Sequence, residues 1–288
     1  FQRIADARFI ADGRIIVADG GLSVLREYDS DGTFVAQMGR RGSGPGEFQS
    51  LRDLWILPPD TIVAWDPRAA RLTYFGGDRT PSRTITLEAA SATVGVGRLD
   101  FLAGALRDGS FVIGAVALAD GLGADSVSIE KIGENGEHLG RVAEMTGLIR
   151  ARLAERVNGP IPFSPYPHVA TYGDVVYHTN GAEPIVRAWS AAGERTIAFP
   201  PHDHDVESEW AAFAAKLERD NVQPFAPAVA TAPRPERIPH LAGLLTDDAG
   251  RLWAKRYDPG TDAIWRGGGA SVCCGCISTT ASRTADRG

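Results

Sequence analysis

The feature that most constrains this chain is an internal repeat of about four dozen residues. The turn residues Asp12, Asp60 and Asp108 are spaced 48 residues apart. Around each turn, short runs rich in β-branched and aromatic residues alternate with Gly, Asp or Asn turns, a pattern typical of antiparallel hairpins. A period in this range indicates a propeller or a solenoid, and four short strands per period favour the propeller, whose blades are small twisted antiparallel sheets.

The repeat can be followed through most of the chain. The predicted copies cover residues 9–39, 51–87, 100–142, 168–199 and, for the part of a fifth that is visible, 240–265. Two insertions interrupt the later copies, and their apolar spacing predicts short helices near 146–157 and 206–221. The predicted fold class is therefore all-β, a β-propeller with about five blades and two short helical insertions within residues 1–265.

The stretch Gly39–Phe48 is predicted to join the first two blades. Four glycines and Pro45 rule out helix or central strand, so the stretch is a shaped loop. Phe48 is expected to seat this loop against the neighbouring blades. Its charged groups are open to two interpretations: they are paired or solvated in a simple connector, or they form a rim that binds an anionic ligand. In the second case the ligand-binding residues are Arg40, Arg41 and Glu47.

Several of these features resemble a known family. Gly-Pro-Gly-Glu-Phe at 44–48, the strand Thr61–Trp65 with Asp66, and the segment Arg71–Phe75 are similar to the NHL-type repeat of bacterial six-bladed β-propeller proteins. The similarity covers about residues 4–265, although Leu51 stands where the repeat commonly has proline. It implies a disc with a central channel, ligand loops at one end and, often, export to the periplasm or outside the cell. No catalytic residue is carried over, because the matching positions build blades.

Composition excludes two broad classes of function. The net charge of −6 and the isoelectric point near 5.6 argue against general nucleic-acid binding, which needs a basic face. No apolar run approaches the roughly 18 residues of a membrane-spanning helix. The chain begins at Phe1 without a signal peptide, so we expect the N-terminus to be cut, and the compartment cannot be read directly.

A second group of candidate ligand-binding residues lies on or beside the predicted inner strands, where a propeller channel would collect them. These residues are His168, His178, Asn180 and Asp247. Propellers that resemble metal-dependent lactonases hold a calcium or zinc ion with such groups. No motif fixes these ligands here, and no Gly-x-Ser-x-Gly elbow or phosphate loop is present, so neither a catalytic residue nor a metal ligand is assigned and a divalent cofactor stays open.

Two shorter features also have alternative interpretations. The run His202-Asp203-His204-Asp205 precedes the second predicted helix, which Asp205 is expected to cap, and the alternative is a divalent metal site. Asp19 and Asp66, each at the end of a strand, are expected to accept hydrogen bonds from amides of the blade turns.

Residues 266–288 break the pattern, and a shifted reading frame or an artificial, disordered end is expected there. Cys273, Cys274 and Cys276 lack the spacing and the companion histidine of a zinc site.

The sequence thus favours a non-enzymatic binding propeller whose partner is a peptide, a glycan or a small molecule. The alternative is a propeller enzyme similar to metal-dependent lactonases or hydrolases, or to a peptide-processing lyase, with its site in the channel. Convergence of His178, Asn180 and Asp247 on one point would favour the enzyme.

Overall fold

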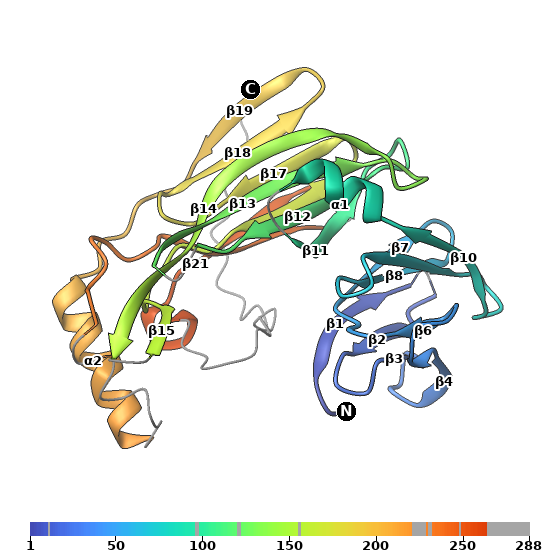
Figure 1. Cartoon of the computed structure of the whole chain (residues 1–288), viewed down its shortest axis with the longest axis horizontal. Coiled ribbons are helices and arrows are strands. Elements are labelled where there is room, and N and C mark those ends of the chain that lie inside the picture. Colours follow the sequence, from blue (N-terminus) through green and yellow to red (C-terminus); the bar gives the residue numbers. More distant parts are fainter. Residues whose placement is uncertain are drawn as a thin grey trace. The chain divides into compact units, whose positions relative to one another are not determined.

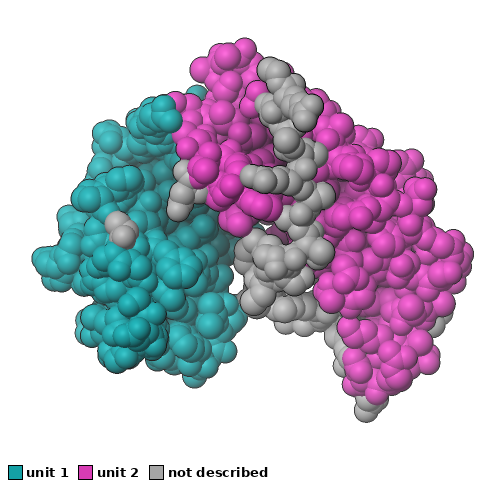
Figure 2. Space-filling view, turned by 180° about the vertical axis from the view of Figure 1, so that it is seen from behind, with its two compact units in different colours: residues 1–115, 129–141, 271–276 teal, residues 116–128, 142–270, 277–288 magenta. Residues whose placement is uncertain are grey.

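The computed structural model describes residues 1–10, 12–95, 98–119, 122–154, 157–220, 229, 232–247 and 249–263, and within them antiparallel strands dominate (Figure 1). Two compact units divide the chain (Figure 2). The first contains residues 1–115 and 129–141, and the second contains residues 116–128 and most of the described chain from Val142 onward. Each unit is considered by itself below.

The first two predicted copies form two separate four-stranded meanders. The first is built from β1 (Ile4–Phe9), β2 (Ile15–Asp19), β3 (Val24–Tyr28) and β4 (Phe34–Met38). The second is built from β7 (Asp53–Leu57), β8 (Thr61–Asp66), β9 (Arg71–Phe75) and β10 (Pro81–Thr86). The central strands β2 and β8 carry β-branched residues that are almost wholly buried, which is the environment these side chains favour. The prediction of two similarly built blades is confirmed.

The loop between these blades contains a short parallel pair, β5 (Arg40–Arg41) with β6 (Glu47–Phe48). Phe48 is fully buried, and its ring centroid lies 6.2 Å from that of Phe75. Gly39 has φ +73°, and a Cβ added to it would lie 2.5 Å from the Phe48 ring, so glycine is required for both the backbone and the close packing. The predicted role of Phe48 in seating the loop is confirmed.

The third sheet corrects one prediction. Its order is β11 (Arg98–Ala105), β12 (Phe111–Ala117), β13 (Gly123–Ile132), β14 (His138–Ala154) and β15 (Val157–Pro160). The prediction of a helix near 146–157 is wrong, because β14 continues as a strand to Ala154. Its last residues pair with β15, beginning with Arg150 opposite Pro160. Pairing with β15 gives this segment inter-strand hydrogen bonds, and this tertiary context overrides its helix-like apolar spacing.

The remaining sheets follow the predicted fourth and fifth copies. The fourth sheet contains β16 (His168–Tyr172), β17 (Val175–Thr179), β18 (Ile185–Ser190) and β19 (Gly193–Ala198). The fifth is a pair, β20 (Leu241–Thr246) with β21 (Leu252–Arg256). The succession of antiparallel meanders confirms the predicted all-β propeller class of fold. The tail from 266 onward lies outside the described residues.

Three helices accompany the sheets in the described residues: α1 (Glu88–Val94), α2 (Val206–Arg219) and α4 (Pro259–Asp262). The helix predicted near 206–221 is confirmed as α2, which buries Trp210, Phe213 and Leu217. Asp205 caps it by accepting a hydrogen bond from the Ser208 N–H at 2.8 Å, as expected. Helix α1 was not predicted, and its seven residues follow β10 directly.

The cores lie between neighbouring sheets, as in stacked blades. In the first unit, one cluster joins β2 to β8 through Ile16 and Ile62, and another joins β9 to β12 through Leu72 and Phe111. In the first unit, the first strands of neighbouring sheets also contact each other, because β7 contacts both β1 and β11. In the second unit, β16 contacts β20 in the same way. These inner strands therefore bring equivalent positions of successive blades together.

Candidate functional site

The charged residues of the loop between the first two blades are largely engaged with the loop itself. Arg40 Nε donates to Glu47 Oε1 at 2.6 Å, and the Gly44 N–H donates to Glu47 Oε2 at 2.9 Å. These two interactions, the Gly44 N–H first, hold the pKa of Glu47 below its usual value. Arg41 donates to the carbonyl of Gly21 at 2.9 Å. Pairing within the connector matches the simpler interpretation, and ligand binding by Arg40, Arg41 and Glu47 stays a prediction.

The second group of predicted residues lies in the second unit. His168 is partly buried at the start of β16, and burial, followed by the charge of Lys255, lowers its pKa to about 4. His178 is buried on β17 with its Nε2 3.5 Å from Glu194 Oε2. Burial lowers the pKa of His178 as well, against the raising effect of Glu194. Both rings are therefore held towards the neutral form.

Asn180 and Asp247 have local structural partners. The Asn180 amide donates to the Thr146 carbonyl at 3.3 Å and accepts from the Ala182 N–H at 3.2 Å. Asp247 closes the turn between β20 and β21: it accepts from Arg251 N at 2.9 Å and from Trp253 Nε1 at 3.0 Å. The Trp253 hydrogen bond is the largest cause that lowers the pKa of Asp247 to about 2.

These residues do not meet at one point. His178 on β17 pairs with Val169 on β16. Asn180 lies two residues further along the chain than His178, past the start of β16. Thr246, which precedes Asp247, donates instead to the carbonyl of Thr171 near the end of β16. At about 3.3 Å per strand residue, Asn180 and Asp247 are separated by on the order of 10 Å. The arrangement expected for a single channel site is therefore absent from this group, and ligand binding by its members stays a prediction.

The structure instead brings together residues of the first unit that the sequence analysis missed. Asp6, Asp53 and Asp100 lie 47 residues apart on the contacting inner strands β1, β7 and β11. Asp6 Oδ2 accepts from the Leu54 N–H at 3.1 Å, and Asp53 Oδ2 accepts from the Leu102 N–H at 2.9 Å. The carboxylates of Asp6 and Asp53 thus each tie their own inner strand to that of the next blade.

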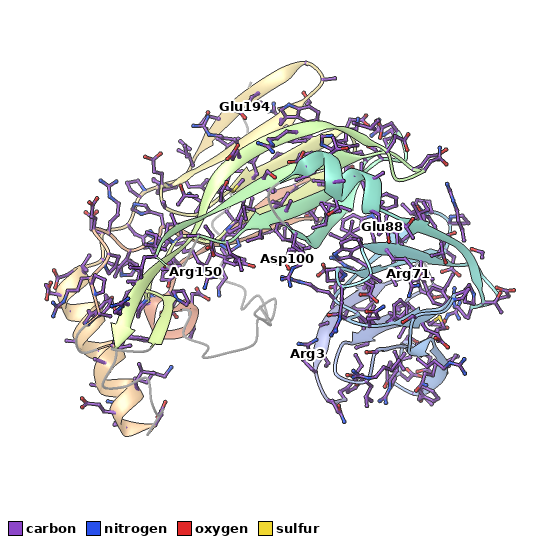
Figure 3. All side chains as sticks on the ribbon, in the orientation of Figure 1. Arg3, Arg71, Glu88, Asp100, Arg150 and Glu194 are labelled. Atoms are coloured by element: carbon purple, nitrogen blue, oxygen red, sulfur yellow. The ribbon has the colours of Figure 1, made fainter. Side chains whose placement is uncertain are left out.

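The carboxylates of Asp6 and Asp100 orient three arginines. Arg8 donates to Asp6 Oδ2 through Nε at 3.3 Å and Nη2 at 3.2 Å, and its guanidinium lies 4.8 Å from the centroid of the Trp55 ring. Asp100, labelled in Figure 3, pairs with Arg52 at 2.6 Å and with Arg98 at 2.8 Å. We call these seven residues the inner-strand cluster: Asp6, Arg8, Arg52, Asp53, Trp55, Arg98 and Asp100. The signal that could have revealed it is the 47-residue spacing of the acids.

Asp53 is the electrostatically unusual member of the inner-strand cluster. Burial raises its pKa to about 7, although the nearby Arg52 and the Leu102 N–H act to lower it, and the charge of Asp6 raises it further. A carboxyl group with a pKa in this range exchanges protons near neutral pH, as a general acid or base does.

Replacing Asp53 with asparagine is expected to change how stability depends on pH. Because the folded pKa is raised, the folded protein holds this proton more tightly than the unfolded chain, and native stability falls as pH rises from about 4 to about 7. Asparagine does not titrate. Relative to the native protein, Asp53→Asn should gain ~2–3 kcal/mol in free energy of unfolding between pH 5 and pH 8, measured by urea denaturation. If the variant and the native protein differed in free energy of unfolding by the same amount at pH 5 and at pH 8, the raised pKa of Asp53 would be contradicted.

Comparison with known proteins agrees with this fold. Residues 1–96 match the family DUF5128, described as a 6-bladed beta-propeller. No curated protein sequence matches the chain significantly. The fold class is thus all-β and of the six-bladed β-propeller type, with about five blades in this chain. In the described residues, no group of three or more His, Cys, Asp or Glu side chains is arranged to hold a metal ion. No helix of that part is long and apolar enough to cross a bilayer.

Solved structures with low sequence identity also resemble the chain. Virginiamycin B lyase from Staphylococcus aureus is 10% identical, with a TM-score of 0.44 over 89% of this chain and 64% of the lyase. A gluconolactonase from Xanthomonas campestris is 13% identical, with a TM-score of 0.47 over 88% of this chain and 71% of the enzyme. A Bacteroides fragilis protein described as a candidate for export is 12% identical, with a TM-score of 0.45 over 90% of this chain and 69% of that protein. The chain thus spans less than two thirds of the lyase, and these likenesses say nothing about its activity.

Proposed function

We propose that the protein is a binding propeller that holds an acidic, acceptor-rich ligand on the inner-strand cluster. The observation that carries the proposal is the orientation of Arg8 and Arg98 by Asp6 and Asp100. An arginine fixed by a carboxylate, or stacked on an aromatic ring, presents its other N–H donors in a set direction and loses little entropy on binding. Arg98 is 67% exposed and Arg8 34% exposed, so both guanidinium groups can be reached from solvent.

The chemistry of the arginines selects the ligand class. Planar guanidinium groups recognise carboxylates by paired hydrogen bonds, which a single ammonium group cannot make. A glycan or a small molecule that carries carboxylates, or an acidic peptide, would satisfy them. The same carboxylates that orient the arginines repel a ligand that approaches without aligning to the N–H donors, which favours specificity.

Substitution of Arg8 tests this proposal. Uronic-acid oligosaccharides, their neutral counterparts and acidic peptides would be titrated against the protein by calorimetry. Arg8→Gln should weaken binding of the acidic ligand at least about tenfold, equivalent to ~1.4 kcal/mol. Arg68→Gln is the matched control, because Arg68 is exposed in the turn after β8 and outside the cluster. Absence of binding by every acidic ligand, or equal losses in both variants, would refute the proposal.

One observation favours a second function, a hydrolase or lyase with its site on the same strands. It is the pKa of Asp53, raised to about 7 by burial. In this alternative Asp53 acts as the general acid or base, and a lactone and ester panel would reveal turnover. Activity that disappears in Asp53→Asn, while the fold and ligand binding persist, would favour the enzyme over the simple binding module.

The repeat type and the location of the protein extend the proposal. We propose that the blades are of the NHL type found in bacterial, exported propellers. Supporting this, Arg71, labelled in Figure 3, donates to the carbonyls of Ser43, at 2.8 Å, and of Glu47. The arginine of the repeat thus holds the Gly-Pro-Gly-Glu-Phe loop that precedes its blade.

A further inference from the structure

Three histidines of the second unit lie in contact where the chain enters α2. His202 and His204 precede that helix, and His240 precedes β20. The ring centroid of His202 lies 4.6 Å from that of His204 and 5.1 Å from that of His240, and both pairs of rings meet edge to face. We call these three residues the histidine cluster.

The histidine cluster joins segments that are far apart in the sequence. His202 Nε2 lies 3.3 Å from the carbonyl of Tyr257, which follows β21. The His240 backbone N–H donates to the Gly181 carbonyl at 2.7 Å, and the His240 carbonyl accepts from the Tyr257 N–H at 3.0 Å. The entry of α2 is thus held, through imidazole rings, to the start of β20 and the end of β21.

The hydrogen bond between two of these rings accommodates a limited number of protons. His202 Nδ1 and His240 Nδ1 are 3.4 Å apart, and one proton between them makes the bond. The Tyr257 carbonyl can only accept, so His202 Nε2 carries a proton of its own. One further proton makes one ring cationic and leaves the bond intact, because the other Nδ1 still accepts. A second further proton places two N–H groups face to face between two cations, and the contact becomes repulsive.

The neighbours of the His202 ring oppose its protonation. Burial lowers the pKa of His202, and the hydrogen bond to the Tyr257 carbonyl only partly offsets this effect. The charges of His204, Arg256 and His240 lower it further. The His202 backbone N–H, 3.5 Å from His240 Nδ1, also faces the nitrogen that would receive a proton. Protonation of both rings is therefore unfavourable while the cluster is assembled.

The acidic groups around the cluster have partners of their own. Glu209 of α2 lies 3.2 Å from His204 Nδ1 through its Oε1. Asp258 accepts a hydrogen bond from the Gly260 N–H at 2.9 Å in α4. Asp203, the next residue after His202, lines a pocket of about 360 Å³ together with Asp258 and the His202 and His204 side chains. These carboxylates soften the repulsion between the rings, but the contact between the two Nδ1 atoms has no carboxylate in it.

From this geometry we propose that the histidine cluster is an acid-sensitive latch, which holds the entry of α2 at neutral pH and releases it when both rings of the pair become charged. Because the pKa of His202 is lowered in the folded protein, the stabilisation is complete above about pH 6.5 and is lost as pH falls below that value. Helix α2 buries Trp210, Phe213 and Leu217, so its release uncovers an apolar surface.

Hydrogen exchange of α2 tests the latch. Protection factors of the amides of Val206–Arg219 would be measured at pH 7 and pH 5 by mass spectrometry, with correction for the intrinsic exchange rate at each pH. Carboxyl groups of ordinary pKa stay largely ionised over this range, so histidines dominate the change. We expect the protection of α2 in the native protein to fall at least about tenfold between pH 7 and pH 5.

Two variants locate the effect. In His202→Gln the side-chain amide can still donate to the Tyr257 carbonyl but does not titrate, so the fall in protection should shrink to about threefold or less. His138→Gln alters a histidine of the first unit that pairs with Glu130, and its α2 should lose protection as the native protein does. Protection that does not change with pH, or an equal fall in His202→Gln and the native protein, would overturn the proposal.

A titration of the native protein needs no variant and decides the matter if His202→Gln does not fold. Nuclear magnetic resonance of the histidine ring protons should show His202 and His240 gaining their charges in two separate steps. Both rings becoming charged together near pH 6.5, with α2 still in place, would overturn the latch. The histidine cluster is separate from the inner-strand cluster, so failure of one proposal leaves the other intact.

Discussion

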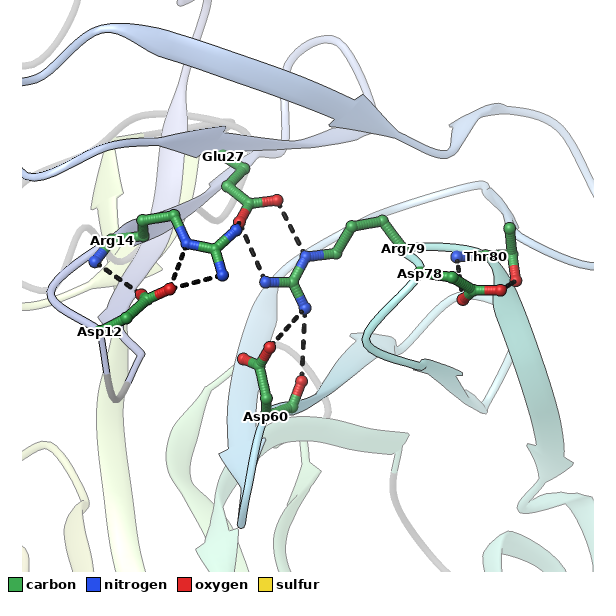
Figure 4. A network of polar contacts seen from close by, with 7 residues as sticks. All are labelled: Asp12, Arg14, Glu27, Asp60, Asp78, Arg79 and Thr80. Carbon is green, nitrogen blue, oxygen red and sulfur yellow. Dashed lines mark hydrogen bonds and ion pairs between the residues drawn. The ribbon is translucent and has the colours of Figure 1, made fainter.

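Replacing Glu27 with alanine is expected to lower the free energy of unfolding by about 3–5 kcal/mol. Glu27 lies on β3 with only 1% of its side chain exposed, and it pairs with Arg14 and, at 2.9 Å, with Arg79 (Figure 4). Arg79 follows β9 of the next blade and is itself only 11% exposed. Among the described residues, removal of the carboxylate would leave the buried Arg79 guanidinium with Asp60, at 3.1 Å, as its one acidic partner. The buried ion pair therefore couples the first two blades.

Two variants separate the effect of charge from the loss of side-chain volume. Glu27→Gln keeps the shape and an acceptor, so it should cost less than alanine but more than a surface substitution. Asp12→Ala removes an exposed partner of Arg14 and should change stability far less. Urea denaturation measures the free energy of unfolding of Glu27→Ala, Glu27→Gln and Asp12→Ala, provided that the dependence on urea concentration has the same slope in each. A Glu27→Ala protein as stable as the Asp12→Ala protein would show that this network does not hold the blades together.

Replacing Asp66 with alanine should be similarly damaging, with an expected loss on the order of 3–5 kcal/mol, since each buried donor left without an acceptor costs about 1–3 kcal/mol. Asp66 is fully buried at the end of β8. Its carboxylate accepts from four backbone N–H groups, those of Gln49, Ser50, Arg68 and Ala69. Gln49 and Ser50 precede the second blade, whereas Arg68 and Ala69 lie in the turn after β8. The Asp66 side chain therefore links the segment that enters the blade to a turn within it.

Asp66→Asn tests the explanation, because it keeps one acceptor oxygen and should fall between the native protein and the alanine variant in thermal and urea unfolding. Asp19, 47 residues earlier, makes the equivalent contacts with Gln2, Arg3, Gly21 and Leu22. Burial acts to raise the pKa of Asp19, but these N–H groups outweigh it and lower the pKa. Its contribution is therefore present above pH 4 and lost as pH falls further. Equal stability of Asp66→Ala and Asp66→Asn would contradict the role of the accepted N–H groups.

Much of the architecture could be predicted because blade building is local. The Asp-Gly turns, the buried strands β2 and β8 and the capped helix α2 all follow from neighbouring residues, and so do the buried Phe48 and the amide contacts of Asp19 and Asp66. The strand β14 could not be predicted in the same way. Its apolar residues also fit helical spacing, and only pairing with β15 decides between the two forms.

The candidate sites show the same division. The sequence contained the 47-residue spacing of Asp6, Asp53 and Asp100, but not the fact that β1, β7 and β11 lie side by side. It also contained His202 and His204, whereas His240 joins them from a distant segment.

By itself, the sequence determined the repeat, the strand and turn order of each blade, and the acids that close the blade turns, because these depend on contacts a few residues apart or one period apart. The tertiary structure alone decided which charged side chains meet. Stacking places strands from different blades in contact, and whether Asp53 keeps its proton near pH 7 depends on burial and on charges that those neighbours supply.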